Sequence, residues 1–351
     1  MPSGTYDRYG LTGNPFRDLS SENVEDVELL HVNLQVDETL RTIKDEVFDK
    51  ENKAIVALIG NNGAGKTERL RLAEAQGRQL KAFTVYVDVT ERTSWVLRSV
   101  AEEVVKAANL GGFTQLFSSP RWFRDVQALQ KTKDPRYDPV RAGKAIASAL
   151  NAKAPSLLLL NDLHHSMLLK GEADLFARTL QEVCDAIRPG VLVMFGCFPN
   201  YMTWLGKAQP GLYSRINRSL ILPSLSNEEA GLMLAKKMLA KRVVENLDPL
   251  YPFDGAAVAA LNGAAFGNPR RLLELADQAI EYGVAHRSYR IDSEVVGLAL
   301  SSNRVGEALA SSVSPPASSV VAPGPAPPGA GTSRSSPLSS GGAGAARGGG
   351  S

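Results

Sequence analysis

The sequence feature that most constrains the fold is a glycine-rich octapeptide, GNNGAGKT at residues 60–67, set between an apolar run and a helical pattern. The run at 54–59 (AIVALI) has no polar residue, which is typical of a strand buried on both faces of a parallel sheet. A helical pattern begins at Glu68 and reaches about Leu80. A strand, a G-x-x-x-x-G-K-[ST] loop and a helix in this order predict a phosphate-binding loop.

The residue types of this loop predict ATP and Mg²⁺ as its ligands. Glycines allow backbone N–H groups to turn toward phosphate oxygens, and the first turn of the helix adds a partial positive charge. We expect Lys66 to reach the β- and γ-phosphates and Thr67 to ligate Mg²⁺. The predicted nucleotide-binding residues here are Gly60, Asn61, Asn62, Gly63, Ala64, Gly65, Lys66 and Thr67. An ordinary glycine-rich turn is the alternative, which the flanking strand and helix disfavour.

Strand and helix patterns alternate through the rest of residues 1–223. They predict further strands at 83–89, 156–160, 191–198 and 220–222, and helices at 94–109 and 142–152. This alternation predicts an α/β domain with a parallel sheet covered by helices. After Pro223, helical patterns at 226–245, 256–262, 270–282 and 292–300 predict a small all-helical domain over residues 224–305.

Residues 306–351 form a tail of different composition. Between 311 and 351, 34 of the 41 residues are Gly, Pro, Ala or Ser, so the tail cannot bury enough apolar surface to fold and is predicted to be disordered. Its only charges from residue 311 on are Arg334 and Arg347, which leaves 37 basic and 37 acidic residues in 1–310. This balance excludes a generally basic, nucleic-acid-coating body but allows a local basic patch.

Cysteine and apolar content exclude other classes of protein. Only Cys184 and Cys197 are present, so a disulfide scaffold and an all-cysteine zinc site are excluded. The pair His164-His165 lacks the further spaced ligands that a metal centre needs. No apolar run approaches the roughly 18 residues of a membrane-spanning helix. The first residues lack a secretory signal, so we expect a cytoplasmic protein.

A second motif follows the apolar strand at 157–160. In P-loop ATPases such a strand usually ends in Asp, often followed by Glu, whereas this chain has Asn161 and Asp162. In the direct register Asn161 takes the metal-side position without its charge, and Asp162 polarises the attacking water with a shorter side chain. A register shifted by one residue makes Asp162 the metal-side residue, and a simple turn cap is a third reading. In both functional registers one carboxylate is missing, so we expect slow hydrolysis.

Three further motifs are similar to those of the AAA+ ATPases. Residues 9–16 (YGLTGNPF) resemble the opening YGLxxNPF, residues 214–216 with 222–229 (SRI, LPSLSNEE) resemble an SRI…L-x-PL-S-x-EE passage, and 267–271 (GNPRR) resembles the GxPR turn of the lid. The resemblance is to the branch of general secretion pathway protein A and the TniB/TnsC-type transposition ATPases, and more distantly to the ORC/Cdc6 initiators. It implies an ATP-dependent homo-oligomer, a ring or a filament, that recruits or remodels an unidentified protein partner.

The resemblance also implies roles for individual residues. Arg215 matches the arginine that reaches a neighbouring subunit's γ-phosphate, with Arg218 as the nearest substitute. Arg270 matches the lid arginine that touches the nucleotide of its own subunit. Guanidinium groups suit both roles because they neutralise charge on transferring phosphoryl oxygens, and surface salt bridges are the alternative. Asn200 is the candidate polar sensor, and residues 14–16 are expected either near the adenine or in the core.

Basic and aromatic residues are interleaved between 111 and 137. The segment holds Arg121, Trp122, Phe123, Arg124, Lys131, Lys133, Arg136 and Tyr137, and its charge is diluted by Asp125, Asp134 and Asp138. Such a pattern can grip phosphates and stack bases, which makes sequence-nonspecific DNA one candidate ligand. A protein contact and a solvated insertion are the alternatives. Two functions stay open: an ATP-hydrolysing AAA+ oligomer acting on a partner, with or without DNA, and a slow or non-hydrolysing ATP-licensed scaffold.

Overall fold

The computed structural model describes residues 5–17, 31–32, 34–49, 52–90, 95–108, 119–131, 137–168, 171–244 and 247–302. The predicted tail and the basic residues Lys133 and Arg136 lie outside these ranges. None of the described helices is long and apolar enough to pass through a membrane.

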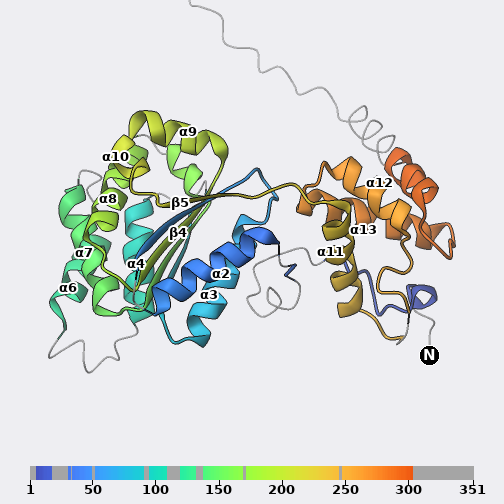
Figure 1. Ribbon diagram of the computed structural model, residues 1–351, viewed down its shortest axis with the longest axis horizontal. Coiled ribbons are helices and arrows are strands. Elements are labelled where there is room, and N and C mark those ends of the chain that lie inside the picture. Colours follow the sequence, from blue (N-terminus) through green and yellow to red (C-terminus); the bar gives the residue numbers. More distant parts are fainter. Residues whose placement is uncertain are drawn as a thin grey trace, which may run out of the picture. The chain divides into compact units, whose positions relative to one another are not determined.

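A five-stranded parallel sheet forms the centre of the α/β part, in the order β2-β3-β4-β1-β5. Figure 1 shows helices on both sides of this sheet. Its strands are β1 (Ala54–Ile59), β2 (Phe83–Asp88), β3 (Ser156–Asn161), β4 (Val191–Cys197) and β5 (Arg218–Ile221). The predicted α/β fold with a parallel sheet is confirmed. All residues of β1, β3 and β4 are buried, as their continuous apolar runs require.

Helices cover both faces of the sheet, and side chains of each strand alternate between the two cores. On one face, Val56 and Leu58 of β1 pack with α2 (Gln35–Phe48) and α3 (Lys66–Gln79). On the other, Ile55 and Ala57 pack in a larger cluster with α4 (Val96–Ala108), α6 (Arg121–Lys131), α7 (Pro139–Ala152) and α8 (Glu172–Ala186). The period of two along a strand therefore sends successive side chains to opposite layers.

Shorter helices connect the later strands. A 3-10 turn, η2 (Leu163–Leu168), follows β3, and α9 (Pro199–Ala208) and α10 (Pro210–Tyr213) lie between β4 and β5. After β5 the chain is helical, with α11 (Asn227–Ala240), α12 (Gly255–Ala265), α13 (Pro269–Ala285) and a helix over 293–302. Ser226 begins α11 with a capping box: its side chain accepts from the Glu229 N–H, and the Glu229 carboxylate accepts from the Ser226 N–H.

The first described segment, residues 5–17, packs with the C-terminal helices, whereas the sequence predicts it to belong to the α/β domain of residues 1–223. Tyr9, Leu11 and Phe16 belong to the hydrophobic cluster of α11–α13 and not to the layers around the sheet. The Tyr9 hydroxyl, for example, donates to the Ser288 carbonyl at 2.8 Å. A continuous span such as 1–223 misses this because burial joins side chains that are distant in sequence. The C-terminal helices, which we call the lid, thus share their core with the N-terminal segment.

Candidate nucleotide-binding site

The glycine-rich loop lies at the carboxyl end of β1 and leads directly into α3. Gly63 and Gly65 have positive φ angles of 77° and 89°, a left-handed conformation that glycine adopts without steric cost. Gly65 is the residue before the first helical position, Lys66. The loop therefore leads into a helix N-terminus whose first N–H groups have no partner within the helix, as anion binding requires.

Lys66 is buried, and its ammonium is held by the loop itself. Its Nζ donates to the carbonyls of Gly60 at 2.9 Å and Asn61 at 3.0 Å, and it lies 4.7 Å from the centre of the Phe198 ring. Burial lowers the pKa of Lys66, an effect that the nearby Asp162 opposes. A buried cation whose hydrogen bonds go to the carbonyls of its own loop fits a site built for an anionic ligand.

The last residue of β3, Asn161, carries an amide in a fixed orientation. Thr67 donates from Oγ1 to Asn161 Oδ1 at 3.0 Å. The Asn161 Nδ2 donates to Asp88 Oδ1 at 2.8 Å and lies 3.3 Å from Asp162 Oδ2. The Asn161 amide oxygen faces the Thr67 hydroxyl because an oxygen accepts a hydrogen bond, and the amide nitrogen faces the carboxylates because it donates. The contact with Thr67 favours the direct register, in which Asn161 stands at the metal side.

Asp88 was not among the candidates from sequence. It ends β2, and the parallel register aligns it with Asn161 of β3. The signal that points to it is an acidic residue at the end of an apolar strand, since carboxyl ends of parallel strands gather at one edge of a sheet. Among the described residues no group of three or more His, Cys, Asp or Glu side chains could hold a metal ion by itself. Mg²⁺ in nucleotide sites is bound through one or two side chains, phosphates and water, so these residues fit it.

Asp162 follows Asn161 in an unusual backbone conformation. Its φ is +50°, a left-handed value that is uncommon outside glycine. Burial raises the pKa of Asp162, while the nearby cationic Lys66 acts in the opposite direction. His164 is buried close by, with Nδ1 4.0 Å from Asp162 Oδ1 and its ring stacked on Phe198, and burial lowers its pKa to about 4.

The lid contacts the tip of the loop at the N-terminus of α13, through the capping residue Asn268 and through Arg270 in the first turn. Asn268 donates from Nδ2 to the Asn62 carbonyl at 2.7 Å, and Arg270 donates from a guanidinium nitrogen to Asn62 Oδ1 at 3.2 Å. The Arg270 backbone N–H also donates to the Gly63 carbonyl at 3.3 Å. Loop and lid residues line a cavity of about 450 Å³. The candidate lid arginine is thus positioned beside the loop.

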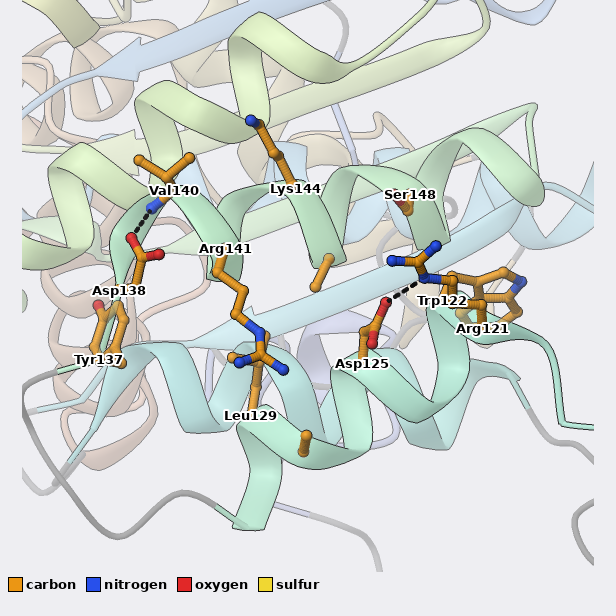
Figure 2. A pocket seen from close by; sticks show the side chains of 12 residues that line it. Arg121, Trp122, Asp125, Leu129, Tyr137, Asp138, Val140, Arg141, Lys144 and Ser148 are labelled. Atoms are coloured by element: carbon orange, nitrogen blue, oxygen red, sulfur yellow. Dashed lines mark hydrogen bonds and ion pairs between the residues drawn. The ribbon is translucent and has the colours of Figure 1, made fainter.

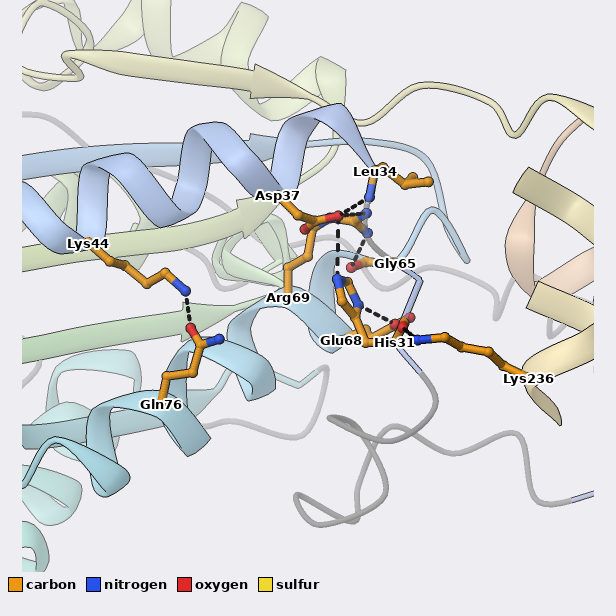
Figure 3. Close-up of polar contacts among 9 residues, drawn as sticks. All are labelled: His31, Leu34, Asp37, Lys44, Gly65, Glu68, Arg69, Gln76 and Lys236. Carbon is orange, nitrogen blue, oxygen red and sulfur yellow. Dashed lines mark hydrogen bonds and ion pairs between the residues drawn. The ribbon is translucent and has the colours of Figure 1, made fainter. Parts of the chain in front are cut away.

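A polar network supports the loop from α2 and from the segment before it (Figure 3). Arg69, in the first turns of α3, forms two 2.9 Å contacts with the Asp37 carboxylate and lies 3.3 Å from the Gly65 carbonyl. His31 contacts Glu68 at 2.7 Å and Asp37 at 3.4 Å. Lys236 of α11 donates to the His31 carbonyl. The network therefore joins the loop, α2 and the lid.

Among the described residues, Arg215, Asn200 and Phe16, for which the sequence allows a role in the nucleotide site, form no hydrogen bond or ion pair with the loop. Arg215 contacts Asp185 of α8 in its own chain. Asn200 is exposed in the first turn of α9, and the residue over Lys66 is Phe198 instead. Phe16 is in the lid core against Phe253, which matches the core alternative for this residue. The neighbouring Asn14 donates to carboxylates of α13.

A groove of about 920 Å³ lies between α6 and α7 (Figure 2). Arg121, Trp122 and Tyr137 line it, together with two exposed cations of α7, Arg141 and Lys144. Arg121 is 3.8 Å from Asp125, and Asp138 caps α7 by accepting from the Val140 N–H at 3.0 Å. Within the described part of the chain no carboxylate pairs with Arg141 or Lys144, so the groove has an excess of positive charge.

No family model matches the sequence, and no curated protein matches it significantly. Solved structures do match. The Aeropyrum pernix ORC2 protein, in ADPNP–ADP complexes, has a TM-score of 0.54 and 14% identity over 79% of this chain and 71% of that chain. The Aeropyrum pernix ORC1 protein, in complex with DNA, has a TM-score of 0.51 and 17% identity over 81% and 72%. Together with the loop, the sheet order and the lid, these similarities establish that the chain has the fold of the P-loop AAA+ ATPases.

Proposed function

We propose that this protein is an ATP-dependent, oligomeric AAA+ ATPase that assembles when ATP is bound and recruits or remodels a partner on DNA. The observation that carries the proposal is the arrangement of Lys66, Thr67 and Asn161 at the carboxyl end of β1. A buried lysine, a hydroxyl and an oriented amide oxygen meet at the N-terminus of α3. This is the set of groups that binds a triphosphate and its metal.

Each residue of the site has a distinct task when MgATP is bound. Lys66 exchanges its two loop carbonyls for phosphate oxygens, and Thr67 offers its hydroxyl to Mg²⁺. Bound Mg²⁺ would supply positive charge that offsets the negative charge of the triphosphate. Asp162 orients the attacking water, and Arg270 brings positive charge from the lid toward the γ-phosphate. Because Asp162 is one methylene shorter than the usual Glu, water is positioned imperfectly and hydrolysis is slow.

Assembly depends on Arg215 in this proposal. Its guanidinium forms contacts of 2.7 and 2.9 Å with Asp185 and donates to the Gly211 carbonyl at 2.8 Å. The Arg215 and Asp185 side chains are 34% and 43% exposed, and an exposed ion pair is weak because water screens it. A phosphate of a neighbouring subunit can therefore compete for the arginine, which makes ATP part of the subunit interface.

In this proposal the assembled oligomer binds DNA. The ORC1 structure contains DNA, and the α6–α7 groove supplies cations without a matching number of acids. Repetition of this groove around an oligomer would turn weak phosphate contacts into firm binding. The alternative is an ATP-licensed protein scaffold without DNA, which turns over ATP slowly or not at all. The uncharged Asn161 supports slow or absent hydrolysis, as in that alternative, but it does not bear on whether DNA is bound.

The proposal is tested by comparing ATP with ADP. We expect ATP, but not ADP, to shift the protein to a larger species in light scattering, and the ATP-bound species to retain a fluorescent duplex at low salt. Lys66→Ala should abolish both effects together with ATP binding in calorimetry. An oligomer that forms with ATP but never retains DNA would leave the scaffold alternative. A protein that binds no nucleotide would refute both.

A further inference from the structure

Beside Thr67, at the end of β3, the chain has Asn161 where P-loop ATPases usually have an aspartate. The neighbouring strand β2 ends in Asp88, whose carboxylate contacts the Asn161 amide. Asn161 is almost fully buried, with 3% of its surface exposed, and its amide spans the distance between Thr67 and Asp88. The oxygen end serves the Thr67 hydroxyl at 3.0 Å, and the nitrogen end donates to Asp88 Oδ1 at 2.8 Å. The amide thus connects the metal-side hydroxyl to a carboxylate on the neighbouring strand.

The Asp88 carboxylate is accessible to a cation from solvent. Its side chain is exposed, and it is coupled electrostatically to Asp162, which faces the same amide. Within the part of the chain that the structure describes, no Lys or Arg forms an ion pair with Asp88. Asp162 lies near the cationic Lys66 and Arg270, whereas Asp88 brings an exposed carboxylate to the nitrogen end of the Asn161 amide. Asp88 thus adds negative charge at the edge of the sheet where a divalent ion would accompany a triphosphate.

We infer that Asp88 supplies the negative charge of the Mg²⁺ side of the nucleotide site, with Asn161 as the adaptor that connects it to Thr67. This inference rests on the proposed nucleotide binding. The carboxylate at this edge of the sheet belongs to the end of β2, and the Asn161–Asp88 pair would take the role that an aspartate at position 161 would have. Asp88 is therefore a positioning residue that holds the Asn161 amide and would place negative charge near a bound Mg²⁺, while Asp162 would serve the attacking water.

The alternative is that Asp88 only satisfies the buried Asn161 amide. Both readings predict that Asp88→Asn disturbs the site, but they differ in what is lost. A structural role affects every ligand, because the loop would lose its support. A metal role affects only the divalent ion, because nucleotide without metal is held by the loop N–H groups and Lys66.

The experiment exchanges the two side chains. Four variants are compared with wild type: Asp88→Asn, Asn161→Asp, the double exchange Asp88→Asn/Asn161→Asp, and Asp45→Asn as the control for loss of an exposed carboxylate on α2. Binding of a fluorescent ATP analogue is measured in EDTA. Affinity of the protein–ATP complex for Mn²⁺ is then measured by electron paramagnetic resonance, which does not depend on turnover.

We expect Asp88→Asn to weaken Mn²⁺ binding by about 10-fold or more, in the range seen when groups around metal ligands are removed. ATP affinity in EDTA should stay within about twofold of wild type, and the double exchange, which returns the carboxylate to position 161, should recover most of the Mn²⁺ affinity. Asp45→Asn should match wild type.

Three results would overturn the inference. Asp88→Asn could bind Mn²⁺ as wild type does, it could lose ATP binding in EDTA as well, or the double exchange could fail to recover the metal. In all three cases wild type still binds ATP, so the proposed function survives. Absence of ATP binding by wild type would instead refute the proposed function itself. If Asp88→Asn does not fold, Asp88→Glu, which keeps the charge, should retain Mn²⁺ affinity within a few-fold, and its loss would also overturn the inference.

Discussion

Arg215 and Asp185 form a two-pronged ion pair, with Nε 2.7 Å from Oδ1 and a terminal guanidinium nitrogen 2.9 Å from Oδ2. The pair joins the turn after α10 to α8 and holds the arginine against its own chain. A residue that is to reach a neighbouring subunit must leave this partner. The ion pair therefore competes with assembly, and its two members should have opposite effects when they are replaced.

Replacing Arg215 with alanine should leave ATP affinity of the monomer nearly unchanged and abolish the ATP-dependent increase in light scattering. Hydrolysis by the assembled protein should fall by a factor within the roughly 10³–10⁵ range of arginine fingers. Asp185→Asn should instead lower the ATP concentration needed for assembly, because it releases the arginine. Arg98→Ala, which breaks an exposed ion pair on α4, is the control. Equal assembly by the Arg215 and Asp185 variants would contradict this role.

Asp162→Asn should have opposite effects on activity and on stability. Burial raises the pKa of Asp162 above its value in the unfolded chain. The ionised carboxylate is therefore disfavoured in the folded state, and this cost is fully present above the folded pKa and absent below the unfolded one. At pH 7.5 the nucleotide-free variant should melt at a higher temperature than wild type, while hydrolysis falls by about a hundredfold. A lower melting temperature at that pH, or unchanged hydrolysis, would show that the carboxylate has another task.

Asn161→Asp should make the protein depend on metal for stability. The new carboxylate would face Asp88 Oδ1 at the position where the amide nitrogen now donates over 2.8 Å. Two like charges in contact are unfavourable without a cation. We expect a lower melting temperature in EDTA and a larger rise on addition of MgATP than wild type shows. An equal rise in both proteins would indicate that the metal lies away from this pair.

The His31 network should stabilise the protein most at low pH. Burial alone lowers the pKa of His31, but its hydrogen bonds to Asp37 and Glu68 outweigh that effect and raise the pKa above 6.5. The stabilisation is complete below the unfolded pKa of about 6.5 and is lost as pH rises through the folded pKa. His31→Gln should therefore lower the melting temperature more at pH 6 than at pH 9. The exposed His286→Gln is the matched control, and a loss independent of pH would contradict the ion-pair explanation.

The α6–α7 groove should determine how DNA binding responds to salt. We expect a variant with the groove cations Arg121, Arg141 and Lys144 replaced by Glu to lose DNA retention while ATP-dependent assembly persists. Alanine at Arg141 and Lys144 alone should reduce the slope of log affinity against log salt by about 0.9 for each lost phosphate contact. Lys106→Ala on α4 is the control for a cation outside the groove. An unchanged salt slope would place the DNA elsewhere.

Sequence by itself determined the elements whose signal is local. The apolar run at 54–59, the glycines of the loop and the helix that follows are contiguous, so their order alone predicts a strand, a phosphate-binding loop and a helix. The strands at 83–89, 156–160 and 191–198 were predicted for the same reason, and they occur as β2, β3 and β4 with ends within one or two residues. The short run at 220–222 was predicted about two residues late, because β5 is largely exposed and its apolar signal is weak.

Tertiary structure alone decided which side chains meet. Asp88 and Asn161 are 73 positions apart, and only the parallel register of β2 and β3 makes them partners. The same holds for Tyr9 and Ser288 in the lid core, and for Arg141 and Lys144 facing the groove beside α6. A motif records spacing along the chain, whereas burial and charge act across space. For this reason the strand, the glycine-rich loop and the helix after it could be predicted from the sequence, and the contact between Asp88 and Asn161 could not.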